Sequence, residues 1–381
     1  MMNANWAEFW WTNITGAQTL ISEVANTLLD RRMVILQIPA DLPWRQQMRS
    51  CIFDLYYKQS GYSSESQSVY IDAVDDNPDG LEPGKLVLDR VCVSAADRSG
   101  YRERSNITIQ QYLVQKKLME NVIVWVKGLN GAAVDQWVKF LKGFPKDSAL
   151  FVLECQGSSR IADSRAIHRI CYTENISSYD LQLFNSFYLD SLTATYSPSW
   201  KRYIATAAAL VCESDAEVSE TLLRTMNFME EEIPDGLARV ADMYEFSRRG
   251  AGADSTHVLS HIRRHKLDEI THRIWSAQVQ VLFPIIEIER VSIINRLNDD
   301  LQTALKRNVI VQYNTRITDP MDVEFGTLCY MMAAREKDSD ERILSIPDEK
   351  LRERIHFLRG CRNLLAHACC CSPQQIGGLL D

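Results

Sequence analysis

The chain has 381 residues, a length that corresponds to two or three domains. Its hydrophobic fraction of 46% and charged fraction of 24% match ordinary globular proteins. These values exclude a wholly disordered chain and a small module held together by disulfides. The formal net charge of −8 argues against a protein that coats nucleic acid through a broad basic surface, but it leaves room for a local basic site.

The sequence also bears on location. The N-terminal segment MMNANWAEFWWTNITG has no basic stretch followed by an apolar run, and no later stretch approaches the roughly 18 apolar residues of a membrane span. We therefore expect a cytoplasmic protein without membrane contact. The ten cysteines are scattered apart from the triplet 369–371, and without an export signal we expect reduced thiols.

Short apolar runs alternate with helical patterns over the first half of the chain. Helical spacing of apolar residues predicts helices over 17–31, 43–58, 108–119 and 132–141. Continuous apolar runs predict buried strands over 33–38, 122–126 and 149–153, and the stretches 68–74 and 169–172 read as two further strands. Strands that are apolar on both faces and separated by helices indicate a mostly parallel sheet with helices on both sides. The first half is therefore predicted to be α/β.

The second half reads as helical almost throughout, so the predicted fold class is α/β followed by all-α. Helices are expected over 198–211, over 214–226 and through 255–307. The second of these is predicted to open with a capping box of Ser214 and Glu217.

The glycine-rich segment 249–253 is the best domain boundary after residue 193. We expect an α/β domain over 1–193, a helical lid or linker over 194–250 and a helical domain over 251–381. A parallel sheet followed by a helical lid resembles the AAA-type and STAND-type P-loop NTPases over about residues 17–245.

The residues that bind phosphate in such proteins are missing. A phosphate cradle needs a glycine-rich loop with lysine directly after the first strand, but segment 38–44 contains neither and includes two prolines, which lack N–H groups. The strand 122–126 is followed by Lys127 and Gly128 in place of a metal-binding acid. Asp72 and Glu154 end other strands and could substitute for the missing metal-binding acid. The preferred interpretation is that both are ordinary carboxylates at the ends of strands. We expect a degenerate fold without cofactor or ATP hydrolysis that serves regulation or docking.

The most informative stretch lies near the C-terminus. Arg362 and Asn363, followed three residues later by His367, match the signature of the HEPN superfamily, which this sequence resembles specifically over 355–380. Segment 372–375 combines an N-cap serine, a proline and a glutamine three residues on, so a new helix is predicted there. The resemblance implies that the C-terminal helical domain is a HEPN-like bundle.

Catalytic HEPN proteins are metal-independent ribonucleases, often of toxin or phage-defence systems, with sites composed across a two-fold dimer. The resemblance implies that His367 is a general acid or base toward the ribose 2′-hydroxyl, that Arg362 stabilises the phosphorane and that Asn363 orients the substrate. Asn363 and His367 are four residues apart and share a helix face, whereas Arg362 and His367 are about 140° apart. The arginine must therefore curl round the helix, or the helix must loosen near His367.

A structural interpretation of the same residues is open. Arg362 could pair with a carboxylate of a neighbouring helix, while Asn363 and His367 satisfy helix ends inside a bundle. The chain would then be a scaffold or sensor that binds a partner protein through its α/β half and dimerises through its helical half.

A second candidate site lies in the segment HVLSHIRRHKLDEITH. The histidines at 257, 261 and 265 would share one helix face if the segment were one helix, but it lacks the His-Glu-x-x-His pattern of zinc helices. A solvated basic face that steers RNA phosphates is the preferred interpretation over a metal site. The predicted RNA-binding residues are His261, Arg263, Arg264, His265 and Lys266.

Overall fold

The computed structural model describes residues 5–61, 67–77, 80–92, 94–101, 106–156, 163–192, 196–252, 255–337 and 340–381. The chain forms two compact units. The first comprises Met1–Phe184 with Ser214–Glu217, and the second comprises Asn185–Glu213 with Val218–Asp381. The division into three parts at residues 193 and 250 stays a prediction.

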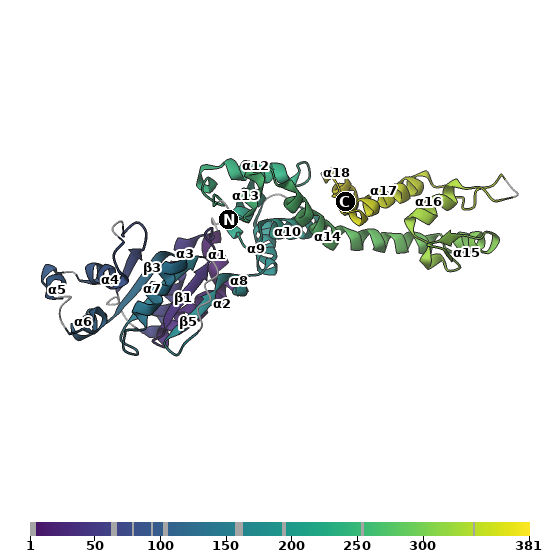
Figure 1. Cartoon of the computed structure of the whole chain (residues 1–381). Coiled ribbons are helices and arrows are strands. Elements are labelled where there is room, and N and C mark those ends of the chain that lie inside the picture. Colours follow the sequence, from purple (N-terminus) through teal and green to yellow (C-terminus); the bar gives the residue numbers. More distant parts are fainter. Residues whose placement is uncertain are drawn as a thin grey trace. The chain divides into compact units, whose positions relative to one another are not determined.

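The first unit is built on a five-stranded sheet in the order β2-β3-β4-β1-β5, and every neighbouring pair is parallel (Figure 1). Its strands are β1 Met33–Ile38, β2 Gln67–Asp72, β3 Val122–Asn130, β4 Leu150–Gln156 and β5 Ile167–Cys171. Helices lie between most successive strands, as parallel crossovers require. This confirms the predicted α/β class with a parallel sheet.

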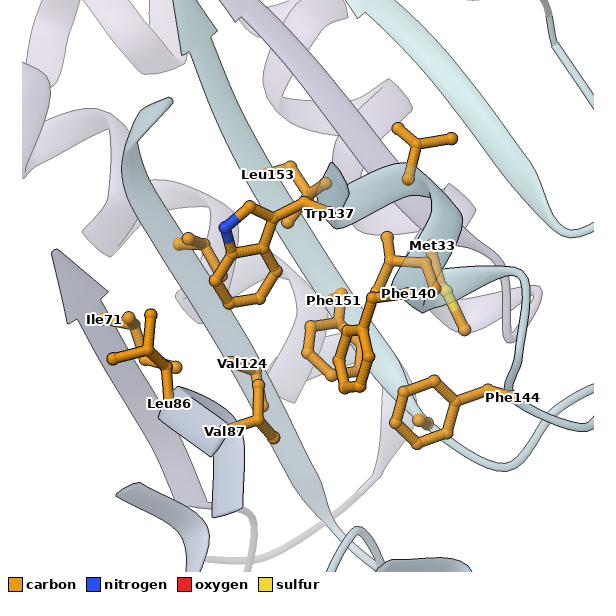
Figure 2. Packing of buried hydrophobic residues seen from close by; sticks show 14 of the residues in the cluster. Met33, Ile71, Leu86, Val87, Val124, Trp137, Phe140, Phe144, Phe151 and Leu153 are labelled. Carbon is orange, nitrogen blue, oxygen red and sulfur yellow. The ribbon is translucent and has the colours of Figure 1, made fainter. Parts of the chain in front are cut away.

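One face of this sheet packs on a large apolar core (Figure 2). Phe151 and Val124 point from β4 and β3 toward Trp137 and Phe140 of α7, and Leu86 of α4 extends the same core. Alternate strand residues face the other way, so Trp125 and Glu154 lie on the opposite face, where they meet Arg49 of α3. The helices of this half are α1 Trp6–Asn13, α2 Thr15–Leu29, α3 Arg45–Ser60, α4 Pro83–Val91, α5 Ala95–Gly100, α6 Ile109–Gln115, α7 Gly131–Leu141, α8 Tyr172–Asn175 and α9 Ser178–Ser191.

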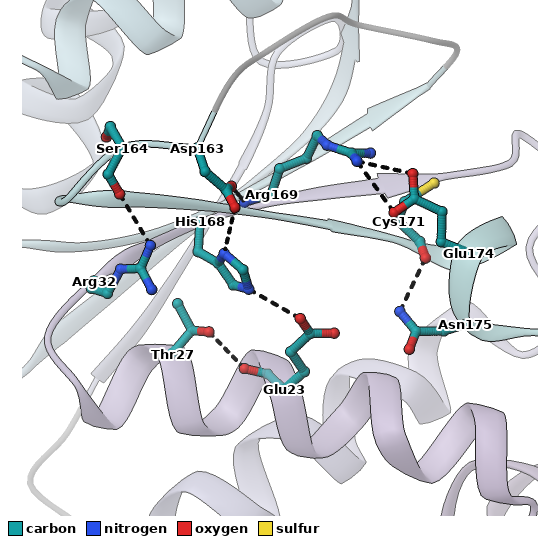
Figure 3. Close-up of polar contacts among 10 residues, drawn as sticks. All are labelled: Glu23, Thr27, Arg32, Asp163, Ser164, His168, Arg169, Cys171, Glu174 and Asn175. Atoms are coloured by element: carbon teal, nitrogen blue, oxygen red, sulfur yellow. Dashed lines mark hydrogen bonds and ion pairs between the residues drawn. The ribbon is translucent and has the colours of Figure 1, made fainter.

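A histidine joins the edge strand β5 to helix α2 (Figure 3). The two ring nitrogens of His168 lie 3.2 Å from Asp163 Oδ2 and 3.0 Å from Glu23 Oε1. Burial alone would raise the pKa of the Asp163 carboxyl, but a hydrogen bond from the Arg169 N–H and the nearby His168 lower it below its ordinary value. The network therefore holds the edge of the sheet against α2.

Over the described residues, the second unit is helical apart from one small hairpin and a single antiparallel bridge between Arg335 and Arg342, which confirms the all-α second half. Its elements from the end of α9 onward are α10 Pro198–Cys212, α11 Ala216–Thr225, α12 Ile233–Asp242, η1 Tyr244–Phe246, α13 Val258–Arg263, α14 Leu267–Arg296, α15 Asn298–Arg307, β6 Val311–Gln312, β7 Thr315–Arg316, η2 Pro320–Asp322, α16 Phe325–Ala333, α17 Glu349–Ala366 and α18 Pro373–Leu380. None of the helices formed by the described residues combines the length and apolar character needed to cross a bilayer.

Two helices open with capping boxes, and the one at residues 372–375 confirms the predicted helix start. Thr108 opens α6 and Ser372 opens α18, each with the reciprocal hydrogen bonds of a capping box. The box predicted at Ser214 is wrong, because α11 begins at Ala216 and the Glu217 N–H donates instead to Asp215 Oδ1 at 3.2 Å. The Glu217 carboxylate is thereby available to another part of the first unit.

Candidate active site on helix α17

Helix α17 carries the Arg-Asn-x3-His motif. Its buried face consists of Leu351, Ile355, Leu358, Cys361 and Leu365, which follow the spacing of three and four that anchors a helix in a core. The Asp348 side chain caps its N-terminus by accepting from the Leu351 N–H at 3.1 Å, and it pairs with Arg296 at 3.0 Å. The Leu351 hydrogen bond is the main reason that the pKa of Asp348 lies below its ordinary value.

The helix ends at the motif histidine. The Cys369 N–H donates to the Leu364 carbonyl at 2.9 Å and the Ala368 N–H to the Leu365 carbonyl at 3.4 Å, which together form a Schellman motif. Ala368 adopts a positive φ of 57°, where glycine is usual. His367 is the C-cap with φ −102° and ψ 22°. The regular helical conformation therefore ends at His367. This is one of the two arrangements that would let Arg362 and His367 act together, the other being an arginine that curls round the helix.

Arg362 is half-buried and forms an ion pair. Its Nη2 lies 3.2 Å from Glu324 Oε2, and the two side chains are 26% and 33% exposed. The Nε of Arg362 is buried and has no hydrogen-bond partner among the described residues. This pairing matches the structural interpretation of the arginine, but both partners reach solvent, so the guanidinium is not sealed inside the bundle.

Asn363 and His367 are both exposed. They lie four residues apart, and Arg359 lies four residues before Asn363, so the three follow one side of α17. Arg362 and Asn363 border a hollow of about 270 Å³, together with Arg359, Glu324 and Tyr313. His367 is not among the residues that border this hollow. The structure thus brings two of the three predicted catalytic residues to one concave surface and leaves the third open beyond it.

Sequence reasoning missed Arg359, Glu324 and Tyr313. The arginine could have been found from its helical spacing to Asn363. Glu324 and Tyr313 are distant in sequence from the motif, and no local pattern marks them.

The predicted RNA-binding segment does not form one helix. Helix α13 ends at Arg263, and His265 has a positive φ of 52° with the Lys266 N–H bonded to the His261 carbonyl at 2.9 Å. A Schellman motif therefore breaks the segment, and the expectation of a shared imidazole face is wrong. His257 accepts a hydrogen bond from the Leu259 N–H as N-cap of α13.

The basic residues of this segment have different surroundings. Arg263 donates to the carbonyls of Ala241 in α12, Phe246 in η1 and Arg249 in the following loop, so its guanidinium is bound by backbone groups of the segment before α13. Arg264 is exposed and donates to the Gly252 carbonyl at 2.6 Å. His265 and Lys266 are exposed, and His261 is half-buried. RNA binding by this segment stays a prediction.

The carboxylates considered as metal ligands are paired with cations. Asp72 Oδ2 lies 2.7 Å from Lys127 Nζ, and Glu154 receives Arg49 Nε and Nη2 at 2.6 and 2.9 Å. Burial raises the pKa of Asp72, but Lys127 and two backbone N–H groups lower it below its ordinary value. The described residues contain no group of three or more side chains suited to hold a metal ion.

The start of α3 is where a P-loop protein would place phosphate. Here the Trp44 N–H donates to Glu217 Oε2 at 3.1 Å, so a carboxylate of the chain itself meets this helix N-terminus. Trp44 has a positive φ of 43°, and Arg45 turns back to the Ala40 carbonyl at 3.0 Å.

Comparisons with known proteins give no family. No protein-family model and no curated protein matches the sequence. Among solved structures, the Aeropyrum pernix ORC2 protein is similar in its ADP form, with 11% identity, 91% of this chain and 93% of that chain covered, and a TM-score of 0.30. Its ADPNP–ADP complexes match with 10% identity, the same coverage and a TM-score of 0.29. Scores this low are no basis for transferring function.

Proposed function

We propose that the chain is a metal-independent endoribonuclease whose catalytic groups lie at the C-terminal end of α17. The observation that carries the proposal is the exposure of His367 and Asn363 at the loosened end of a helix whose neighbouring Arg362 also reaches solvent. A histidine, an amide and a guanidinium are the groups needed for transfer of a phosphodiester to its own 2′-hydroxyl. The resemblance to the HEPN superfamily supplies the reaction.

In the proposed reaction His367 takes the proton of the ribose 2′-hydroxyl. The 2′-oxygen then forms a bond to phosphorus while the bond from phosphorus to the 5′-oxygen breaks. The leaving 5′-oxygen takes a proton from the protonated imidazole of the equivalent histidine in a second copy of the chain, as expected for a site shared across a dimer. Arg362 stabilises the additional negative charge on the phosphorane, and Asn363 orients the phosphate by hydrogen bonds.

The α/β unit is proposed to serve as a regulatory or docking domain. Two prolines lack N–H groups in the loop before α3, Glu217 already accepts from Trp44, and Arg49 neutralises Glu154. The prolines and Glu217 oppose the binding of nucleotide phosphates at the usual place, and the pairing with Arg49 opposes metal binding by Glu154. A toxin or phage-defence setting follows from the HEPN resemblance alone.

The product identifies the mechanism. Purified protein incubated with single-stranded RNA and EDTA is expected to leave 2′,3′-cyclic phosphate ends, which liquid chromatography with mass spectrometry detects. Products with 3′-hydroxyl ends, or cleavage only after a divalent metal is added, would contradict the proposed chemistry.

The ion pair between Arg362 and Glu324 favours a second candidate, a non-catalytic scaffold. In that case the pair holds α17 against the start of α16, and the chain binds a partner protein without cleaving RNA. Protein that is folded and dimeric but leaves RNA intact under these conditions would support this alternative.

A further inference from the structure

The hollow beside the motif is bordered by three elements of the second unit. Tyr313 comes from the β6–β7 hairpin, Glu324 and Gly326 from the start of α16, and Arg359 and Arg362 from α17. Its volume of about 270 Å³ suits a group no larger than one nucleotide.

The hairpin presents an aromatic ring at this hollow. Tyr313 and Asn314 form its two-residue loop with φ values of 50° and 61°, as in a type I′ turn. Gln312 ties the hairpin to α16, because its Oε1 accepts hydrogen bonds from the Glu324 N–H and the Thr327 hydroxyl. The Tyr313 side chain is 82% exposed, so an anchored backbone carries an open ring suited to stacking on a base.

The charges of the hollow favour an anion with several acceptor oxygens. Arg359 and Arg362 lie three residues apart on α17 and both border the hollow, against one acid, Glu324. Only one terminal nitrogen of Arg362 is paired with Glu324, and its buried Nε has no partner in the part of the chain that the structure describes. A phosphate could take the place of the Glu324 carboxylate and satisfy both guanidinium groups.

We propose that the hollow binds one nucleotide of a single-stranded RNA, with its phosphate between Arg359 and Arg362 and its base stacked on Tyr313. The inference rests on the proposed function in so far as the bound polymer is the substrate. Asn363 connects the hollow to His367 one helical turn further on, so the phosphate held between Arg359 and Arg362 is the scissile one, on which Arg362 acts in the proposed reaction. Glu324 occupies the phosphate position in the free protein.

Gly326 offers a sharp test, because it borders the hollow and a Cβ at this position meets no atom within 4 Å. Gly326→Leu should fill the space, and leucine favours the helix more than glycine does, so the variant should fold. The probe is a fluorescent single-stranded oligonucleotide with 2′-O-methyl groups, which cannot be cleaved by 2′-hydroxyl attack. We expect the affinity for this oligonucleotide to fall at least about fivefold, which corresponds to the loss of one stacked base.

The matched control is Ala333→Leu, which adds the same side chain at an exposed position at the other end of α16 and should bind as the wild type does. Tyr313→Ala should weaken binding about fivefold or more, while Tyr313→Phe should keep most of the affinity because the ring remains. Thermal unfolding of each variant shows that the fold is retained.

The outcomes separate this inference from the ribonuclease proposal. Wild-type affinity in the folded Gly326→Leu variant overturns the inference, even if the protein cleaves RNA. Loss of binding in that variant, in a protein that never cleaves RNA, supports the subsite and overturns the ribonuclease proposal. A wild-type protein that does not bind the oligonucleotide overturns both.

Discussion

The side-chain amide of Gln278 hydrogen-bonds both backbone groups of Cys371. Its Oε1 accepts from the Cys371 N–H at 2.6 Å, and its Nε2 donates to the Cys371 carbonyl at 3.0 Å. Gln278 is 1% exposed and lies on α14, so a buried amide fixes the segment that follows His367. Trp275, one turn earlier on α14, adds a hydrogen bond from its Nε1 to the Leu365 carbonyl at 2.7 Å.

Replacing this amide should therefore destabilise the end of α17. Gln278→Met keeps the volume but leaves a buried N–H and a buried carbonyl without partners, which should lower the free energy of unfolding by about 2–3 kcal/mol. Urea unfolding followed by circular dichroism measures the change. A loss below about 0.5 kcal/mol would show that water or another group replaces the amide.

Glycine at position 368 should stabilise the C-terminal turn of α17. Ala368→Gly relieves the strain of a positive φ and should stabilise the protein by about 0.5–1 kcal/mol. Ala366→Gly is the matched control, because residue 366 is helical and glycine there should destabilise by about 0.5–1 kcal/mol. Opposite signs for the two variants in urea unfolding are the expected result, and the same sign for both contradicts the assigned turn.

Asp348 should make the stability of α17 depend on acidity. The hydrogen bond from Leu351 and the ion pair with Arg296 lower its pKa in the folded state, so its contribution is complete above about pH 4, its unfolded pKa, and is lost as pH falls through the folded pKa. Asp348→Asn keeps a cap but loses the charge, so the wild type should exceed it in stability at pH 6, and this advantage should diminish as the pH falls below about 4. A difference that does not change between these pH values would contradict the assignment.

Glu324 should restrain the arginine of the motif. Glu324→Gln removes the negative charge that holds Arg362, so the variant is expected to bind the 2′-O-methyl oligonucleotide about two- to fivefold more tightly than the wild type does. Fluorescence anisotropy measures the affinity. If the pair is purely structural, the variant should instead lose stability while its affinity for RNA remains unchanged.

Strands β1, β3 and β4 were predictable because each is built on an apolar run bounded by polar or turn residues, whereas β2 and β5 include polar residues. Strand β1 has the predicted bounds, 33–38. Strand β3 is longer than predicted, because it continues beyond Val126 to Asn130 with a shift in register and a positive φ of 78° at Gly128. Lys127 and Gly128 therefore mark a bulge and not the strand end that their residue types indicate.

The helix ends and ion pairs were harder to predict. Glycine is the usual signal for a left-handed residue that ends a helix, but His265 and Ala368 take that role here without it. The partner of Arg362 lies 38 residues away, on another helix, and only the folded chain brings it near. The motif itself and the capped helix after it depend on local sequence, and for that reason both could be recognised.

The central claim is that His367 takes part in RNA cleavage. The decisive measurement compares the cleavage rate of single-stranded RNA, in EDTA, by the wild type and by His367→Ala, with His356→Ala as a control for an exposed histidine on the same helix. His367→Ala should be slower by at least about 100-fold, and the control should retain activity. Equal cleavage by the wild type and His367→Ala would contradict the proposed catalytic role of His367.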